Sequence, residues 1–345
     1  IMAYTTINKS TDYFNTKLWN GNSSTQAITG VGFAPDFVWG KQRTGVENHQ
    51  LLDVIRGVNN ILVSNNDTGN TPDTNILNSF DSDGFTLGNQ NQLNDTGQTY
   101  VGWNWKANGS GSSNTDGSIN TTYTSANTTS GFSISTYTGT GSNATVGHGL
   151  GVAPSVIIVK RTNTTGDWVM YHEALGNGKN IRMNDTGAED TSSSVWNATT
   201  PTSSVFSVGT FAETNGSSDT FIAYCFADIQ GYSKFGSYVG NGNADGPFIY
   251  TGFKPAFIIL KTSTIAGNDW VLFDNKRLGY NVSNDSLKPN WNGAEQTGLD
   301  IELLSNGFKL RGAQNDINGS GGTYIFMAFA AAPLVGSNNI PANAR

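Results

Sequence analysis

Cysteine and charge are both scarce in this sequence. The one cysteine, Cys225, excludes a disulfide within the chain. It lies inside the apolar segment 221–226, so we expect a small buried hydrophobe rather than a reactive thiol. Charged residues make up 13% of the 345 residues, against about 25% in an average soluble domain. The sequence therefore predicts a neutral, polar surface.

Basic clusters and long apolar runs are also missing. The net charge is −7 and no run of Lys and Arg is longer than two residues, which argues against nucleic acid as a partner. No apolar run approaches the ~18 residues that span a bilayer. Residues 1–8 do not combine a charged region with an apolar one, as a secretory signal would. We expect neither nucleic-acid binding nor membrane insertion.

Catalytic patterns find little support. The histidines His49, His148 and His172 are not at metal-ligand spacing from one another. The sequence contains no Gly-x-Ser-x-Gly elbow and no phosphate-binding glycine loop ending in Lys-Ser/Thr. A glycosidase's two carboxylates cannot be recognised from sequence alone, so that possibility stays open. We expect a protein that is not an enzyme and needs no cofactor.

Glycine, asparagine, threonine and serine are abundant, with 42 glycines among them. These residues form tight turns and strands with one solvated face. No long stretch has the 3.6-residue period of an amphipathic helix. The composition predicts an all-β fold.

One pattern occurs three times: glycine, then proline, a run of apolar residues and a closing lysine. The copies lie at 32–41, 151–160 and 252–261, and in each the proline precedes the lysine by six residues. A short apolar run between turn signals predicts a strand buried on both faces. Proline fits at the start of such a strand, where its missing N–H costs least. The lysines Lys41, Lys160 and Lys261 are then scaffold positions.

Other landmarks keep the same register. An aromatic residue followed by a turn precedes each proline by 16 or 17 residues, and an aromatic strand begins 65 to 69 residues after it. These spacings predict three copies of one β unit. The landmarks are Trp19, Tyr137 and Tyr238 upstream, and Tyr100, Phe221 and Tyr324 downstream.

The predicted fold is three tandem small β-sandwich or jelly-roll-like units with extended terminal arms. Each unit offers about six strand candidates. The segment 107–131 is rich in Gly, Ser, Thr and Asn and is typical of a flexible linker. The predicted divisions are an N-terminal arm 1–13, unit one 14–106, the linker 107–131, unit two 132–234, unit three 235–330 and a C-terminal arm 331–345.

Asp81 and Asp83 are weak candidates for a metal site. Asp-x-Asp-Gly opens a calcium loop, but the further oxygen ligands and the distal glutamate of such a loop are missing. The third copy has Asn306-Gly307 at the same position. Because Asp-Gly and Asn-Gly both favour a hairpin turn, we interpret both as turns.

Two polar pairs and two tryptophans are candidates for glycan binding. Asp53 and Arg56 recur as Asp274 and Arg277 at the same spacing. They could form a polar pocket for a sugar, but an ion pair closing a turn is the favoured interpretation. Trp168 and Trp270 occupy equivalent strand positions and are expected in the core. Trp196 and Trp291 lie in polar surroundings, so we expect them to be exposed and able to stack on a sugar.

Three stretches together resemble a repeat of unknown function found in virion structural proteins of marine tailed bacteriophages. They are Phe33–Lys41, Ser79–Phe85 and Tyr100–Ala107, and the chain ends 2–7 and 339–345 resemble the ends of such proteins. The resemblance covers nearly the whole chain and implies no catalytic residues.

The resemblance and the lack of a catalytic pattern favour a non-enzymatic virion protein, assembled in the host cytoplasm and displayed on the particle exterior. A tail appendage, a tail fibre and a capsid decoration are all open. The expected partners are other virion proteins and further copies of the chain. A glycan-binding module for host attachment is the alternative, and a polysaccharide depolymerase is the third possibility.

Overall fold

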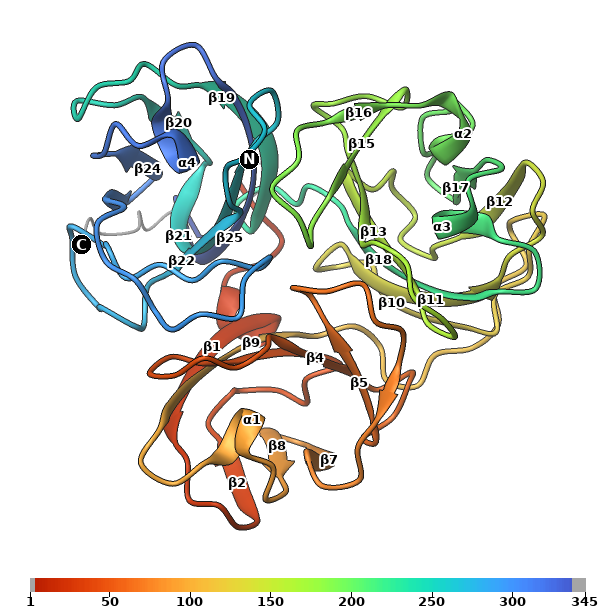
Figure 1. Ribbon diagram of the computed structural model, residues 1–345, viewed down its shortest axis with the longest axis horizontal. Coiled ribbons are helices and arrows are strands. Elements are labelled where there is room, and N and C mark those ends of the chain that lie inside the picture. The colour runs from red at the N-terminus through yellow and green to blue at the C-terminus, as the bar shows by residue number, and fades with distance from the viewer. Residues whose placement is uncertain (1–3, 337–345) are drawn as a thin grey trace.

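The computed structural model describes residues 4–336. Within that range it contains 25 β-strands and four α-helices of four residues each, so the predicted all-β class is confirmed. Figure 1 shows the strands in three lobes around a common centre. We call the lobes set 1, set 2 and set 3 in chain order.

Each set is a continuous stretch of chain. Set 1 contains β1 (Phe14–Asn20), β2 (Gln26–Thr29), β3 (Phe37–Gln42), β4 (Gln50–Asp53), β5 (Asn60–Val63), β6 (Thr71–Pro72), β7 (Leu77–Asp81), β8 (Gly84–Leu87), α1 (Asn91–Asn94) and β9 (Thr99–Trp105). Set 2 contains β10 (Tyr123–Asn127), β11 (Phe132–Thr138), β12 (Ala144–Gly147), β13 (Val156–Arg161), β14 (Val169–His172), β15 (Lys179–Arg182), β16 (Asp190–Thr191), α2 (Ser193–Trp196), β17 (Val205–Val208), α3 (Ala212–Asn215) and β18 (Thr220–Phe226). Set 3 contains β19 (Ser233–Val239), β20 (Phe248–Tyr250), β21 (Phe253–Thr262), β22 (Val271–Asp274), β23 (Ile301–Leu304), β24 (Gly307–Leu310), α4 (Asn315–Asn318) and β25 (Thr323–Pro333).

The large sheets of the three sets share one strand order. Set 1 has β1-β9-β3-β4, set 2 has β11-β18-β13-β14 and set 3 has β19-β25-β21-β22, all antiparallel. The repeated proline-to-lysine stretches form β3, β13 and β21, in the same place in each sheet. Every residue of β3 is buried, and so are nearly all those of β13 and β21. The prediction of strands buried on both faces is confirmed.

A small sheet covers one face of each large sheet. The small sheets are β2-β8-β7, β12-β17 and β20-β24-β23. Between each small sheet and its large sheet lies a separate apolar cluster, which contains for example Phe85 in set 1, Phe206 in set 2 and Phe308 in set 3. β7 and β8 are joined by the two residues Ser82-Asp83, and β23 and β24 by Ser305-Asn306, so the predicted hairpins are confirmed, with Gly84 and Gly307 as the first residues of the second strands.

The other face of each large sheet packs at the centre of the molecule. One apolar cluster there draws residues from all three sets, among them Trp105 of β9, Phe226 of β18 and Phe329 of β25. Trp105 lies 5.6 Å from Phe329 and 6.4 Å from Phe226 between ring centroids. The central strands are therefore covered twice, once inside their own set and once by the other two sets. This double cover explains their continuous apolar runs.

The connecting segments are part of the same body. Ile7 of the N-terminal arm is buried in the central cluster and is followed by a short 3₁₀ turn, η1 (Ser10–Asp12). The segment 107–131, predicted to be a flexible linker, contains β10, and its Ile119 belongs to the core of set 2. Thr124 is buried and bonded to Ser135 of the neighbouring strand, whereas other hydroxyl side chains of the segment, such as Ser110 and Thr115, are exposed. Residues 337–345 of the predicted C-terminal arm lie outside the described residues.

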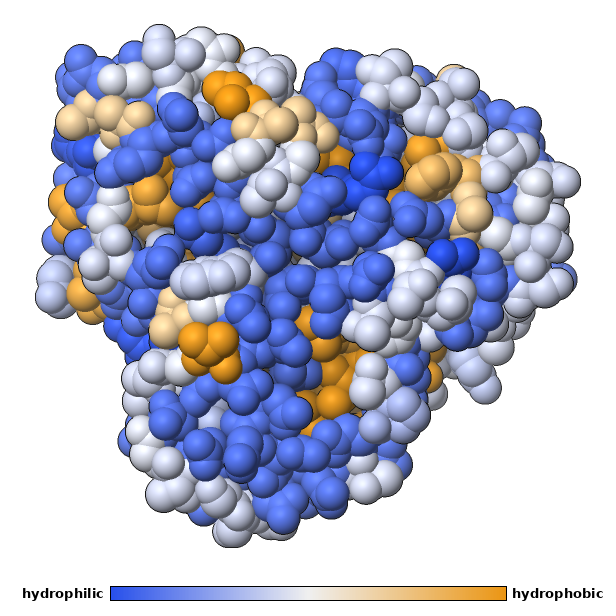
Figure 2. All heavy atoms as spheres, in the orientation of Figure 1, coloured by the Kyte–Doolittle hydropathy of each residue, from blue (hydrophilic) through white to orange (hydrophobic). Residues whose placement is uncertain are grey.

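The surface agrees with the predicted neutral, polar character. Figure 2 shows one face on which hydrophilic residues dominate and apolar residues occur in small, separate groups. Among residues 4–336 no helix exceeds four residues, and none could cross a membrane.

Candidate functional site

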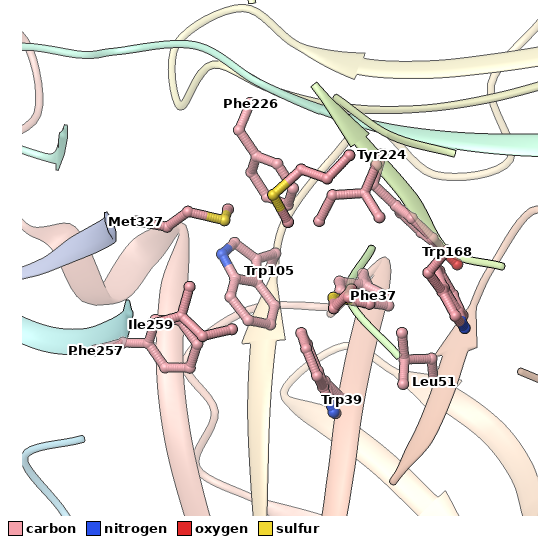
Figure 3. A pocket seen from close by; sticks show the side chains of 13 residues that line it. Phe37, Trp39, Leu51, Trp105, Trp168, Tyr224, Phe226, Phe257, Ile259 and Met327 are labelled. Carbon is pink, nitrogen blue, oxygen red and sulfur yellow. The ribbon is translucent and has the colours of Figure 1, made fainter. Parts of the chain in front are cut away.

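The place where the three sets meet holds a small internal cavity. Figure 3 shows side chains of all three sets pointing toward one another there, with Trp105 among them. The cavity measures about 20 Å³ and its lining is apolar. The buried indole N–H of Trp105 has no hydrogen-bond partner among residues 4–336. A space of this size holds about one water molecule, so the centre is a packed junction rather than a substrate pocket.

Polar side chains around the junction join each set to the next. Asp53, His172 and Asp274 end the equivalent strands β4, β14 and β22. Tyr224 of set 2 donates its hydroxyl to Asp53 of set 1 at 2.7 Å. His172 Nε2 of set 2 lies 3.2 Å from a carbonyl of set 3, and the Trp103 indole of set 1 donates to Asp274 of set 3 at 3.0 Å. The contacts run from set 1 to 2, from 2 to 3 and from 3 back to 1, so three seams close the molecule.

The two acid–arginine pairs lie inside these seams. Arg56 Nε is 2.6 Å from Asp53 Oδ2, and Arg277 Nε is 2.6 Å from Asp274 Oδ2. Both arginines are also bonded to the backbone, Arg56 to the carbonyl of Leu51. Their side chains are 6% and 1% exposed and the aspartates are fully buried. The favoured interpretation as ion pairs is confirmed, and little of these groups is exposed to a sugar, although Arg56 contributes to the lining of a surface pocket of about 230 Å³.

Arg277 has a second carboxylate partner. Its Nη1 lies 2.9 Å from Glu295, which also binds Arg43 of set 1 through two hydrogen bonds. Burial by itself would raise the pKa of Asp274, but the Arg277 guanidinium and backbone N–H donors hold that pKa below its ordinary value. Asp285 lies 4.0 Å from Arg43, so the seam between sets 3 and 1 is a network of two arginines and three carboxylates.

Lys41, Lys160 and Lys261 are fully buried at the ends of the repeated strands. Their ammonium groups donate to backbone carbonyls: Lys160 to Asp67 at 3.1 Å and Lys261 to Thr186 at 3.4 Å, each across a seam. Lys41 donates to Gln42 at 2.6 Å within its own set. Burial lowers the pKa of each lysine to about 8. Their recurrence marked them as scaffold positions, but no pattern in the sequence identified them as buried charges.

Backbone hydrogen bonds repeat the same cyclic arrangement. A loop of each set reaches the loop that follows the proline strand of the next set. Asn70 donates to the carbonyl of Thr162, and Glu189 to that of Ser263, while Glu47 of set 1 donates to Asn292 of set 3. Each seam therefore combines main-chain and side-chain bonds.

The weak metal candidates have separate partners. Asp81 accepts hydrogen bonds from Ser79 and Thr86, both at 2.7 Å. Asp83 accepts the backbone N–H groups of Gly30 and Gly32 at 2.9 and 2.7 Å. Between residues 4 and 336, no three His, Cys, Asp or Glu side chains come together as a metal site would require. Asp83 instead fastens the loop after β2 to the β7–β8 hairpin.

The two candidate tryptophans differ in exposure. Trp291 is 40% exposed, as predicted, and the ammonium of Lys288 lies 6.0 Å from its ring centroid. The expectation of exposure is wrong for Trp196, which is 1% exposed in α2. Its ring packs edge-on against Tyr171 at 5.9 Å. The single helical turn α2 points the side chain of Trp196 toward the core of set 2, although the neighbouring residues are polar.

The remaining expectations for buried residues hold. Trp168 and Trp270 are buried in the central cluster. Cys225 is fully buried, and burial raises the pKa of its thiol to about 12, so it stays protonated and acts as a small hydrophobe. Exposed aromatics that the sequence did not single out include Tyr123, Tyr280, and Phe248 and Tyr250 of β20. Tyr250 and Tyr4 line a surface groove of about 420 Å³.

Comparisons with known proteins bear on the family of the chain. A family model described as a domain of unknown function, DUF7483, matches residues 9–333. The comparison with curated proteins gave no match. The matched range includes all three sets.

Proposed function

The chain belongs to the DUF7483 family of domains of unknown function, and from this premise we propose that it is a non-enzymatic structural protein of a tailed phage particle. In this proposal it lies on the particle exterior, in a tail appendage or as a capsid decoration, and acts through assembly contacts. The proposal includes three copies of one sandwich-like unit as its building plan.

The observation that carries the proposal is that buried polar side chains form hydrogen bonds between the three sets. The aspartates of the two ion pairs and two of the three repeated lysines form hydrogen bonds across a seam between sets. Such groups hold three β bodies in one fixed arrangement, which is what a particle component exposed to solvent and mechanical stress needs. The polar surface and the resemblance of Phe33–Lys41 and Tyr100–Ala107 to phage virion repeats support the same proposal.

Locating the protein in particles tests the proposal. Particles whose genome encodes this chain are purified on a density gradient, and peptides of the chain are quantified by mass spectrometry. Gold-labelled antibodies against the chain are then imaged on intact particles. The proposal predicts a constant copy number per particle and external labelling. A chain that is absent from purified particles and remains in the host lysate would refute it.

Glycan binding for host attachment is the second candidate, and Trp291 favours it. Its ring is partly exposed, and Gly293 lies directly against it, because a Cβ on this glycine would come within 2.2 Å of the ring. The ring is therefore held in place, and a fixed aromatic face is what sugar stacking requires. A glycan array with the native protein and Trp291→Ala, and Trp291→Phe as the conservative control, tests this candidate. Signals that Ala abolishes and Phe keeps would support it, whereas equal signals from all three proteins would refute it.

A further inference from the structure

The outer edges of the three large sheets can be compared position by position. Trp19, Tyr137 and Tyr238 pair with the first aromatic residue of β9, β18 and β25. With this register, β1, β11 and β19 are equivalent edge positions. Thr16 of β1 then corresponds to Ile134 of β11 and to Phe235 of β19.

In set 2 the chain itself covers this edge. β10 pairs antiparallel with β11 and places Ser125 opposite Ile134. The strand is available because the long segment 106–131 connects β9 to β11, whereas only residues 227–232 connect β18 to β19. The fold therefore accepts an added strand at this position and contains one example of it.

In set 3 a carboxylate, instead of a strand, is bonded to the equivalent edge, that of β19. Asp228 accepts the backbone N–H of Phe235 at 2.8 Å and forms an ion pair with Lys234. The N–H that an added strand would use is thus already bonded. Two of the three equivalent edges have an occupant from their own chain.

In set 1, β1 is the last strand of its sheet among the residues from 4 to 336. On the side of β9, the carbonyl of Tyr13 accepts the N–H of Lys106, and the N–H of Gly21 donates to the carbonyl of Gln98. Because backbone groups alternate along an antiparallel ladder, those of Thr16 and Leu18 point away from β9. A surface groove of about 290 Å³ runs along this strand.

Side chains in the groove are suited to a partner strand. The Thr16 hydroxyl is buried, and no hydrogen-bond partner for it exists among residues 4–336. Leu18 is 37% exposed. Lys17 and Lys276 line the groove, which has no carboxylate in its lining. Lysines on an open edge repel a second edge of the same kind, so pairing of two β1 strands is disfavoured.

We propose that the open edge of β1 binds an extended segment of another protein, which adds to the sheet as β10 adds to β11 and carries carboxylates that meet Lys17 and Lys276. Main-chain hydrogen bonds would supply the affinity and the two lysines the selectivity. The proposal does not depend on where the protein acts.

Peptide selection on the intact protein tests this proposal. A library of random nine-residue peptides is displayed and selected on the immobilised full chain, and the enriched peptides are synthesised and measured by fluorescence anisotropy. We expect acidic peptides without a central proline. Selection of no peptide above background, or of basic or helical peptides only, would overturn the proposal.

Variants of the edge locate the binding. Leu18→Pro removes a backbone N–H that is not bonded to β9, and we expect it to reduce the affinity of the selected peptides at least tenfold. Ser237→Pro at the equivalent position of β19 is the matched control and should leave affinity within twofold. If Leu18→Pro does not fold, the double variant Lys17→Glu, Lys276→Glu replaces it. This double variant should no longer bind the acidic peptides, and selection on it should enrich basic peptides. Affinities that neither change alters would contradict the proposal.

Discussion

The ion pair between Asp53 and Arg56 offers the sharpest test of the seams. In the variant Asp53→Asn, the buried Arg56 keeps only neutral partners, the carbonyls of Leu51 and Asn60 and the side chain of Asn70. A buried charge that loses its counterion costs about 3–5 kcal/mol. We therefore expect Asp53→Asn to lower the free energy of unfolding by about 3–5 kcal/mol.

The equivalent pair in set 3 is a built-in comparison. In Asp274→Asn, Arg277 keeps the carboxylate of Glu295 at 2.9 Å. The remaining ion pair compensates part of the loss, so we expect a smaller cost, about 1–3 kcal/mol. Both variants remove one buried aspartate from the same strand position, so local packing effects should be similar. The difference between their losses in unfolding free energy should then measure the contribution of Glu295.

The contact across the seam is measured by a double-mutant cycle. Tyr224→Phe removes the hydroxyl that donates to Asp53, and we expect it to cost about 1.5–3 kcal/mol, as for a hydrogen bond to a charged group. Urea unfolding followed by tryptophan fluorescence gives the free energies of the single and double variants, provided the denaturant slope is unchanged. The reasoning is refuted if Asp53→Asn costs less than about 1 kcal/mol, if Asp274→Asn costs more than Asp53→Asn, or if the two changes simply add.

Three further predictions follow from buried groups and turns. The three lysines have a pKa near 8 in the folded protein, below the unfolded value of about 10.4, so the unfolded chain binds more protons between these values. Between about pH 8 and 9, stability should rise with pH by about 1 kcal/mol per lysine. Above that range the raised pKa values of buried tyrosines such as Tyr137 and Tyr224 act in the opposite direction. Lys261→Met should reduce the slope in urea unfolding over the same pH range, and a flat profile of the native protein there would count against buried lysines. Gly84→Ala should lower the free energy of unfolding by about 2–4 kcal/mol, because φ is +147° and the new Cβ would lie 1.9 Å from the carbonyl oxygen of Ile28. Gly97→Ala should cost only about 1 kcal/mol, because its φ is +84° and no atom lies near the new Cβ. Equal losses in melting temperature for the two variants would contradict this prediction. Trp196→Ala should cost about 3–5 kcal/mol and Trp291→Ala less than about 1 kcal/mol, and calorimetry giving the reverse order would contradict the burial of Trp196.

The repeat was the part of the fold most accessible from sequence. The proline, the apolar run and the lysine of β3, β13 and β21 predicted buried strands, and their shared spacing placed them at equivalent positions. Asp83-Gly84 and Asn306-Gly307 predicted hairpins because both pairs readily adopt φ > 0. These signals depend on residues that are close together in the sequence, so they can be recognised in one sequence without comparison with others.

The meeting of the three sets could not be predicted in the same way. An apolar run such as 257–260 indicates that both faces of a strand are covered, but it does not indicate by what. The partners Tyr224 and Asp53 are 171 residues apart, and neither has a sequence feature that identifies the other. The polarity of its neighbours does not predict the exposure of Trp196, because one helical turn brings this residue of a polar segment into the core. The strand β10 was missed because Ser and Thr serve equally well in a linker and at a hydrogen-bonded sheet edge.

Hydrogen exchange of the intact protein, followed by mass spectrometry in increasing urea, tests most directly whether the three sets form one body. Peptides covering β9, β18 and β25 report on the central strand of each set. If the seams hold the sets together, the slowest amides in all three strands exchange only through global unfolding and give the same opening free energy. Three separate opening free energies, with one set exchanging while the others stay protected, would contradict the account.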